Sequence, residues 1–213
     1  QTATKSIIEW NTFSIGSSAA LSVSGANSSS ILLNRVTGGT LSEVYGQIQS
    51  PGAVWVVNPA GIIFGSGSTI SVGSLLASTL SISNDSFNSN SYNFTNTGST
   101  GSVALNGSIT TTAGSVVAIS PTVTQAGSGA ITASKEVHLL ATDNALLAID
   151  NSGLITTTLN KATVETILNT QGAITTTNGV VELTAMGHSM AAQALIGGTV
   201  TAGGANKGIY VNR

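Results

Sequence analysis

The acidic and histidine side chains are the residues of this sequence whose types could support hydrolytic or metal chemistry. Cleavage of a glycosidic bond needs two carboxyl groups close together, or a carboxylate beside a Lys or Arg. We find no acid that recurs beside another in corresponding strands of the repeat described below. The acids are Glu9, Glu43, Asp85, Glu136, Asp143, Asp150, Glu165 and Glu182. The sequence therefore does not favour an enzyme, and a polysaccharide-active enzyme is kept as the alternative.

The two histidines are also separated from each other. His138 alternates with the apolar Val137 and Leu139, so we expect its ring to point outward into solvent. His188 falls in an expected loop. Because separated histidines without a carboxylate cluster do not make a metal site, we expect neither a metal nor another cofactor.

The composition indicates a thin aliphatic core under a surface with few charges. Charged residues make up 7%, aromatic residues 4% and apolar residues 41% of the 213 residues, whereas roughly 25% of an average soluble domain is charged. The basic residues are scattered and the net charge is −2, so nucleic acid is not an expected partner. No apolar stretch approaches the roughly 18–20 residues that span a bilayer. The first residue is Gln rather than Met, which predicts a processed chain or a fragment.

A repeat organises the C-terminal half. Its units share a Gly-x-(Ile/Val)-Thr core and begin at Gly107, Gly129, Gly153, Gly172 and Gly198. A second short strand follows four of the five cores, and a third precedes several of them, at Thr122–Thr124, Leu147–Ile149 and Thr166–Leu168. Three short strands per unit predict an all-β parallel β-helix with one coil per unit, and roughly ten coils for the whole chain.

The alternation along each strand predicts two columns of side chains. The Ile or Val of each core should face inward, and the Thr that follows it should face outward. The expected inner column is Ile109, Ile131, Ile155, Ile174 and Val200. A regular outer Thr column also raises an ice-binding face as a less favoured alternative, which the irregular coil lengths weaken.

A tight corner interrupts the apolar residues 54–65. Asn58-Pro59-Ala60-Gly61 has the composition of a type I β-turn, because Asn hydrogen-bonds its own backbone, Pro sets φ and Gly relieves crowding. Val54–Val57 and Ile62–Phe64 on either side are strand formers too apolar to face water. The corner should therefore join two buried strands.

Four ordered strings in residues 5–80 resemble a known family. They are Ile8-Glu-Trp-Asn-Thr-Phe-Ser-Ile-Gly16, Leu33-Asn-Arg-Val-Thr-Gly-Gly39, Val57-Asn-Pro-Ala-Gly-Ile-Ile-Phe-Gly65 and Leu75-Leu-Ala-Ser-Thr-Leu80. In this order and spacing they resemble the secretion domain of the filamentous haemagglutinin/haemolysin exoproteins, the passengers of two-partner secretion (TPS). Residues 81–150 match more loosely.

The resemblance implies a right-handed parallel β-helix (solenoid) with extra-helical hairpins and an N-terminal cap, which should be incomplete because the family domain begins upstream of Gln1. Residues 1–213 would form a single β-helix, with the TPS domain in 1–150 and further coils in 151–213. The implied role is the secretion signal of a large adhesin, haemolysin or contact-dependent toxin of a Gram-negative bacterium. The implied partners are the periplasmic domains of a cognate outer-membrane barrel transporter. A host-surface glycan or protein would be bound by the parent exoprotein at the cell surface or after secretion.

The site residues that the resemblance implies lie in two of the strings. They are Asn34, Arg35, Asn58, Pro59, Ala60, Gly61 and Ile62. Ala60 stands where the family has Asn, so the side-chain role at that position is in question. For Arg35 two readings stay open, a contact with the transporter or an ion pair with Glu43.

Residues 84–102 interrupt the rhythm of the coils. Phe87, Tyr92 and Phe94 in this segment resemble the aromatic hairpin that the family places outside the helix. The alternative is a disordered polar loop, but such a loop gains little from three aromatic side chains.

Overall fold

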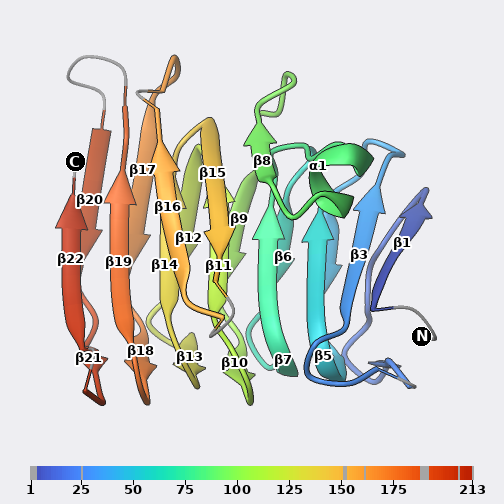
Figure 1. The fold of residues 1–213 in the computed structure, drawn as a ribbon, viewed down its shortest axis with the longest axis horizontal. Helices are drawn as coiled ribbons and strands as arrows, with labels where there is room; N and C mark the ends of the chain where they lie inside the picture. Colours follow the sequence, from blue (N-terminus) through green and yellow to red (C-terminus); the bar gives the residue numbers. More distant parts are fainter. Residues whose placement is uncertain are drawn as a thin grey trace.

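Parallel strands wind into coils that stack along the long axis of the molecule (Figure 1). The computed structural model describes residues 4–24, 26–150, 153–160, 162–187, 192–205 and 207–212. Within these ranges the elements are strands, except for the short helix α1 (Asn84–Asn88). Two parallel sheets form the coils, and a third, antiparallel sheet lies outside them.

The larger parallel sheet has 13 strands. They are β1 (Lys5–Trp10), β2 (Ala20–Ser22), β3 (Ile31–Val36), β5 (Gln47–Val57), β7 (Thr69–Ser78), β10 (Ser108–Thr111), β11 (Val116–Ser120), β13 (Ala130–Ala133), β14 (Val137–Ala141), β18 (Ala173–Thr176), β19 (Val180–Ala185), β21 (Val200–Ala202) and β22 (Gly208–Asn212). The long strand β7 pairs with β10 through its first half and with β11 through its second. In the coils of β5 and β7, one long strand therefore spans the width of this sheet, whereas each later coil spans it with two short strands.

The smaller parallel sheet has six strands, which neighbour each other in chain order. They are β4 (Ser42–Val44), β6 (Ile62–Phe64), β9 (Ser102–Leu105), β12 (Thr122–Gln125), β17 (Thr166–Thr170) and β20 (Ala192–Ile196). The smaller sheet contributes one strand to each of six coils, and one path through the larger sheet stacks eight strands, β1, β3, β5, β7, β11, β14, β19 and β22. The described chain therefore has fewer coils than the roughly ten expected from a solenoid repeat. The difference arises because residues 84–95 and 144–159 build elements outside the coils.

The predicted inner column is present in four of its five positions. Ile109, Ile131, Ile174 and Val200 are register partners on successive strands, and Ile70 of β7 extends the column. The four isoleucines are at most 1% exposed. The third strands expected at Thr122–Thr124 and Thr166–Leu168 are also confirmed, as parts of β12 and β17. These contacts confirm the parallel β-helix.

The unit that begins at Gly153 is not a coil, and this expectation was wrong. Ile155 lies in β16 (Ile155–Leu159) and pairs antiparallel with Ile149 of β15 (Asn144–Ile149). The supposed third strand Leu147–Ile149 is part of β15. The physical reason is that apolar residues alternate with Thr in a hairpin as they do in a coil, so the local pattern does not distinguish the two.

The third sheet and α1 cover the outer face of the larger sheet (Figure 1). In this third sheet β15 pairs with β16 on one side and with β8 (Tyr92–Thr95) on the other. Phe87 and Phe94 are fully buried and Tyr92 is 3% exposed. All three rings pack on Trp55 of β5, with centroids 5.4, 4.8 and 6.1 Å away for Phe87, Tyr92 and Phe94.

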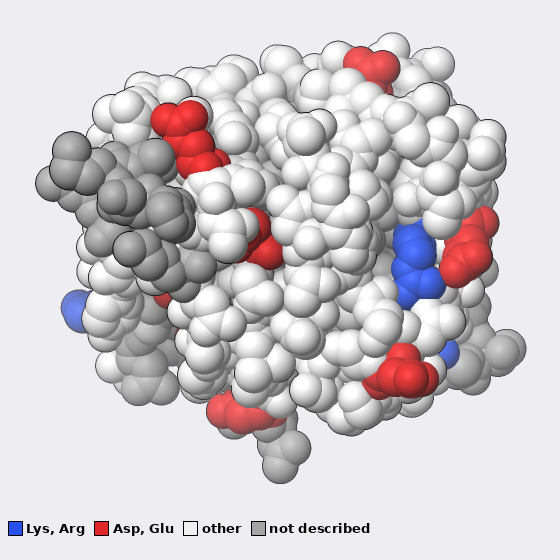
Figure 2. Space-filling model, turned by 90° about the horizontal axis from the view of Figure 1, so that it is seen from above, with Lys and Arg blue, Asp and Glu red and all other residues white. Residues whose placement is uncertain are grey.

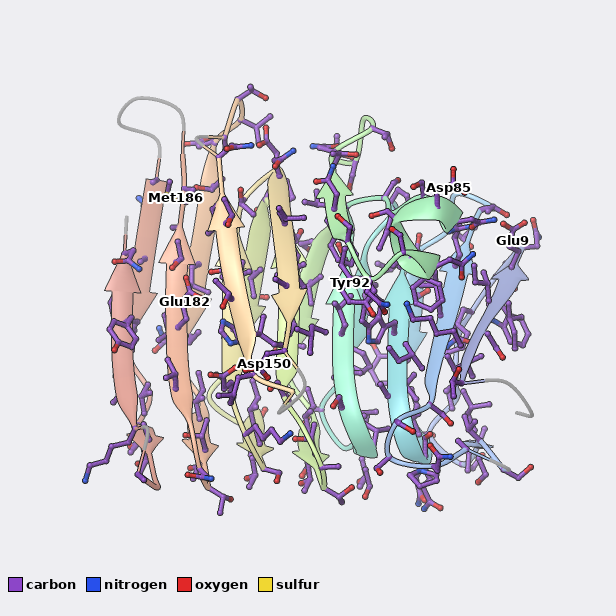
Figure 3. The ribbon with its side chains drawn as sticks, in the orientation of Figure 1. Glu9, Asp85, Tyr92, Asp150, Glu182 and Met186 are labelled. Atoms are coloured by element: carbon purple, nitrogen blue, oxygen red, sulfur yellow. The ribbon has the colours of Figure 1, made fainter. Side chains whose placement is uncertain are left out.

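The aromatic segment is therefore an ordered element outside the helix, as expected. Figure 3 shows Tyr92 at the base of β8, to one side of α1 and in front of the strands of the larger sheet. The segment differs from a self-contained hairpin because it consists of α1 and β8, and β8 finds its partner strand in β15, about fifty residues further along.

The surface carries few and scattered charges, and Figure 2 shows a face that is mostly uncharged. Among the described residues, none of the helical structure has the length and apolar character needed to cross a membrane.

Candidate functional site

The corner at Asn58–Gly61 is a hydrogen-bonded turn, as the sequence predicts. The amide of Gly61 donates to the carbonyl of Asn58 over 3.0 Å, and the amide of Ala60 donates to Asn58 Oδ1, also over 3.0 Å. Gly61 has a φ of +119°, which residues with a Cβ rarely adopt. The turn joins β5 to β6, and Val54–Val57 on one side and Ile62 on the other are at most 3% exposed.

The side chain of Asn58 joins this corner to the preceding coil. Its Nδ2 donates to the carbonyl of Thr40 and to Oγ of Ser42, both over 2.8 Å. Its backbone amide donates to the carbonyl of Ser78 in the following coil over 2.9 Å. Asn58 is completely buried, so in the folded domain its carboxamide bonds inside the protein and is not presented to a partner.

Asn34 makes a similar connection in the first coils. Its Oδ1 accepts from Trp10 Nε1 over 3.1 Å, and its Nδ2 donates to the carbonyl of Trp55 over 3.2 Å. Strand β3, which carries Asn34, lies between β1 and β5. The side chain is 1% exposed, so it bridges three neighbouring strands from within.

Arg35 pairs with Glu9 rather than with Glu43. Its Nη1 lies 3.0 Å from Glu9 Oε1, and its Nη2 donates to the carbonyl of Ile82 over 2.9 Å. Glu9 is the register partner of Arg35 on β1, whereas Glu43 lies on β4 in the other sheet. Of the two readings of Arg35, the ion pair with Glu43 was therefore wrong, because the parallel pairing of β1 with β3 brings Glu9 to Arg35 instead.

The second and third strings meet at a hollow of about 290 Å³. Its lining residues are Arg35, Val36, Thr37, Gly39, Val57, Asn58, Pro59, Ala60 and Ser81. Four of the seven expected site residues thus come together, and Arg35, Pro59 and Ala60 are partly exposed there. Asn34, Gly61 and Ile62 do not line the hollow, and Ile62 packs in the core.

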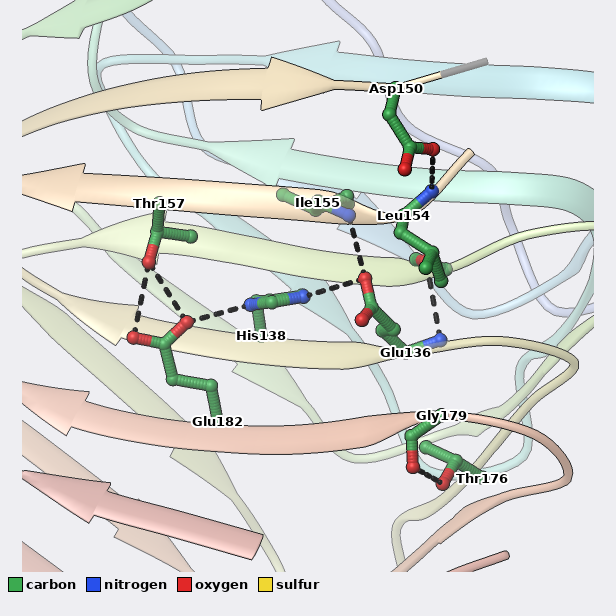
Figure 4. Close-up of polar contacts among 10 residues, drawn as sticks. Glu136, His138, Asp150, Leu154, Ile155, Thr157, Thr176, Gly179 and Glu182 are labelled. Carbon is green, nitrogen blue, oxygen red and sulfur yellow. Dashed lines mark hydrogen bonds and ion pairs between the residues drawn. The ribbon is translucent and has the colours of Figure 1, made fainter. Parts of the chain in front are cut away.

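A buried ionic cluster lies elsewhere, and its centre is His138, whose expected exposure was wrong (Figure 4). Nδ1 of His138 lies 2.8 Å from Glu182 Oε2, and Nε2 lies 3.3 Å from Glu136 Oε2. The ring is on the outer face of β14, as predicted, but β16 lies over it (Figure 4), with Ile155 bonded to Glu136 and Thr157 bonded to Glu182, and only 3% of His138 is exposed. His188 lies outside the described residues.

A signal for this cluster was present in the sequence. Val137-His-Leu139 and Val181-Glu-Leu183 occupy equivalent places in successive units, so stacking puts His138 beside Glu182. The two carboxylates approach opposite nitrogens of one ring, so they do not converge on a common point. Among the described residues, no group of three or more His, Cys, Asp or Glu is arranged to hold a metal ion.

Stacked parallel coils with an aromatic layer outside them place the molecule among parallel β-helix domains. The family model of the TPS secretion domain matches residues 1–212. The chain therefore belongs to the TPS secretion domain family, which confirms the resemblance of the four strings.

Relatives and solved structures agree with this assignment. The chain is 38% identical over 95 residues to a heme/hemopexin-binding protein of Haemophilus influenzae, covering 45% of this chain and 10% of that protein. It is 35% identical over 83 residues to the protein of the same name from strain Rd, covering 39% and 9%. The crystal structure of the HMW1 secretion domain from Haemophilus influenzae superposes with a TM-score of 0.71 at 24% identity, covering 91% of this chain and 58% of that one.

The chain matches about a tenth of the length of these two relatives. It is the secretion domain of a larger exoprotein of the TPS type. Proteins with this domain are secreted or displayed at the surface of Gram-negative bacteria, and the domain interacts with an outer-membrane transporter partner.

Proposed function

We propose that residues 34–35 and 58–62 belong to the export signal that the periplasmic domains of a cognate outer-membrane barrel transporter read while the chain crosses the periplasm unfolded. The observation that carries this proposal is the placement of Asn34 and Asn58. Both carboxamides are at most 1% exposed and fully engaged inside the folded domain. A partner reaches these two side chains before folding and not after it.

Recognition and folding then compete for the same polar groups. In the unfolded chain the carboxamides of Asn34 and Asn58 are open to the transporter, and the apolar strand Val54–Val57 is able to add to an exposed sheet edge. In the folded domain the groups bond to Trp10, Trp55, Thr40 and Ser42 instead. Folding at the cell surface therefore releases the chain from the transporter and opposes its return.

We propose that the larger protein is an adhesin, haemolysin or contact-dependent toxin. Its secretion domain, which this chain forms, is proposed to have no catalytic activity. We place the signal within residues 1–150 and assign the parallel strands β17 to β22 to continued β-helix, on which later coils would stack. The names of the relatives, heme/hemopexin-binding protein, support a parent exoprotein that binds heme or hemopexin. That ligand would be bound outside the secretion domain.

The test uses unfolded peptides, which separates recognition from stability. A peptide of residues 24–65 is titrated into the purified periplasmic domains of the transporter, with wild-type sequence, with Asn58→Ala and with Asn34→Ala. The proposal predicts that each substitution weakens binding at least about fivefold, the scale of one or two lost hydrogen bonds to neutral groups. A peptide with Asn27→Ala outside the two strings is the control. Equal binding of all four peptides would contradict the proposal.

A further inference from the structure

The β15–β16 hairpin is fastened to the coils by a small polar cluster (Figure 4). The backbone amide of Ile155 donates to Glu136 Oε2 over 2.7 Å. Oγ1 of Thr157 donates to Glu182, at 3.1 Å from Oε1 and 2.9 Å from Oε2. Both carboxylates also face His138, so one imidazole ring lies between the two acids that hold the hairpin.

The protonation state of His138 follows from a count of its protons. A neutral imidazole has one N–H and one lone pair, whereas the imidazolium cation has an N–H at both nitrogens. Each ring nitrogen here lies within hydrogen-bond distance of a carboxylate oxygen, and a carboxylate only accepts. A neutral ring would direct a lone pair at one of these oxygens. With both carboxylates ionised, this arrangement is satisfied at both nitrogens only by the cation.

We propose that Glu136, His138 and Glu182 form a charged latch that holds the β15–β16 hairpin on the coils while His138 carries a proton and loosens the hairpin when that proton is lost. The latch is local to the outer layer. The inner columns of the β-helix contain aliphatic side chains at the same coils and do not titrate.

The charged groups around the ring are few. On β11 the register partner of His138 is Val117, on β19 it is Glu182, and on β16 the facing side chain is Thr157. Lys135, which precedes β14, has its ammonium against Gly153, and the Asp150 carboxylate accepts from the amide of Leu154. The two glutamates are thus the charges in direct contact with the ring.

The pH range follows from the direction of each shift. Burial lowers the pKa of His138, but hydrogen bonds to Glu136 and Glu182 and their negative charges outweigh it and raise the pKa above the ordinary 6.5. Its stabilising effect is complete below about pH 6.5 and is lost as the pH rises through the raised pKa. Burial raises the pKa of Glu182, but the bond and charge of His138 hold it below 4.5, so this contribution is lost only in stronger acid. The latch is therefore strongest at pH values between the lowered pKa of Glu182 and the raised pKa of His138.

The latch also depends on two successive coils, because Glu136 precedes β14 and Glu182 is in β19. On the proposed route of export, the hairpin would leave the transporter before its second acid does. The outer layer would then be fastened only after the coil with β19 has folded. This consequence rests on the proposed function, whereas the latch itself is tested on the purified chain without a transporter.

Two measurements on the folded 213-residue chain test the proposal. Nitrogen-15 NMR of the His138 side chain should show both ring nitrogens protonated at pH 6, and a titration midpoint above pH 6.5. Hydrogen exchange should show that protection of the Ile155 amide falls by up to about tenfold per pH unit above pH 6.5, then levels off beyond the raised pKa. Amides of the inner strands β13 and β18 should not share this fall.

Variants make the outcome decisive. His138→Gln should remove the pH-dependent fall in Ile155 protection, and Glu182→Gln should reduce it. Glu165→Gln, which changes an exposed acid by the same charge, should leave the fall unchanged. A His138 titration midpoint at or below pH 6.5, or the same fall in His138→Gln, would overturn the proposal. If His138→Gln does not fold, the NMR protonation state and Glu182→Gln still decide it.

Discussion

The indole of Trp10 donates a hydrogen bond to the carboxamide oxygen of Asn34 over 3.1 Å. This contact joins the first family string to the second, across the neighbouring strands β1 and β3. The same carboxamide donates to the carbonyl of Trp55 on β5. Residues that stand far apart in the family pattern are thus neighbours in space, and one buried side chain holds them together.

Replacing Asn34 should therefore destabilise the domain. Asn34→Ala leaves the Trp10 indole N–H and the buried carbonyl of Trp55 without their partner, which costs about 1–3 kcal/mol for an unsatisfied buried group. The midpoint of urea unfolding at unchanged m-value measures this. Asn93→Ala, at an exposed position of β8, should change the free energy of unfolding by less than about 0.5 kcal/mol. An equal effect of the two substitutions would contradict the structural role of Asn34.

The aromatic layer predicts a second effect on stability. Phe87 is fully buried against Trp55 and Tyr92, and truncation of such a side chain typically costs about 3–5 kcal/mol. Phe87→Ala should therefore lower the urea midpoint strongly and red-shift the fluorescence of Trp55 as water reaches it. Val164→Ala, which truncates an exposed apolar residue, serves as the control. If the fluorescence of Phe87→Ala matches that of the wild type, the packing of this layer is not as described.

Gly101 is predicted to be required behind the Asn58–Gly61 corner. A Cβ at Gly101 would lie 2.5 Å from the Gly61 amide nitrogen and 2.7 Å from the Pro59 carbonyl oxygen, both of them backbone atoms. Gly101→Ala should displace the corner and cost about 1–3 kcal/mol or more through overpacking. Gly16→Ala, where a Cβ would meet nothing within 4 Å, is the matched control. Urea unfolding compares the two variants, and equal midpoints would show that the corner tolerates displacement.

The fold could be predicted from the sequence wherever a residue's neighbours are set by the coil repeat. Ile109, Ile131 and Ile174 stack as expected because each unit presents the same strand at the same place. Ile155 does not stack in this column, because its strand pairs antiparallel with β15. The alternation of apolar and polar residues within a strand does not indicate which strand it pairs with. The Gly153 core lacked a following second strand, which was the available sign that it is not a coil.

In the candidate site, too, contacts between adjacent residues could be predicted from the sequence, whereas contacts between distant strands could not. The turn at Asn58–Gly61 and its Asx hydrogen bond follow from four adjacent residue types. The bonds of Asn58 to Thr40 and Ser42, and the pairing of Arg35 with Glu9, depend on which strands stack. His138 was placed on the correct face, but the hairpin that buries it belongs to a layer that the coil repeat does not specify.

Export in the presence and absence of the cognate outer-membrane transporter is the most direct test of the central claim. The chain is produced in a Gram-negative host with and without the transporter, and the fraction outside the cell is measured for wild type, Asn58→Ala and Asn96→Ala. Asn96 is a matched control because its Oδ1 accepts from the amides of Gly98 and Ser99 in a turn outside the four strings. We predict export that depends on the transporter, and a greater loss for Asn58→Ala than for Asn96→Ala after the losses are compared at equal stability. Export without the transporter, or equal losses for the two variants, would contradict the account.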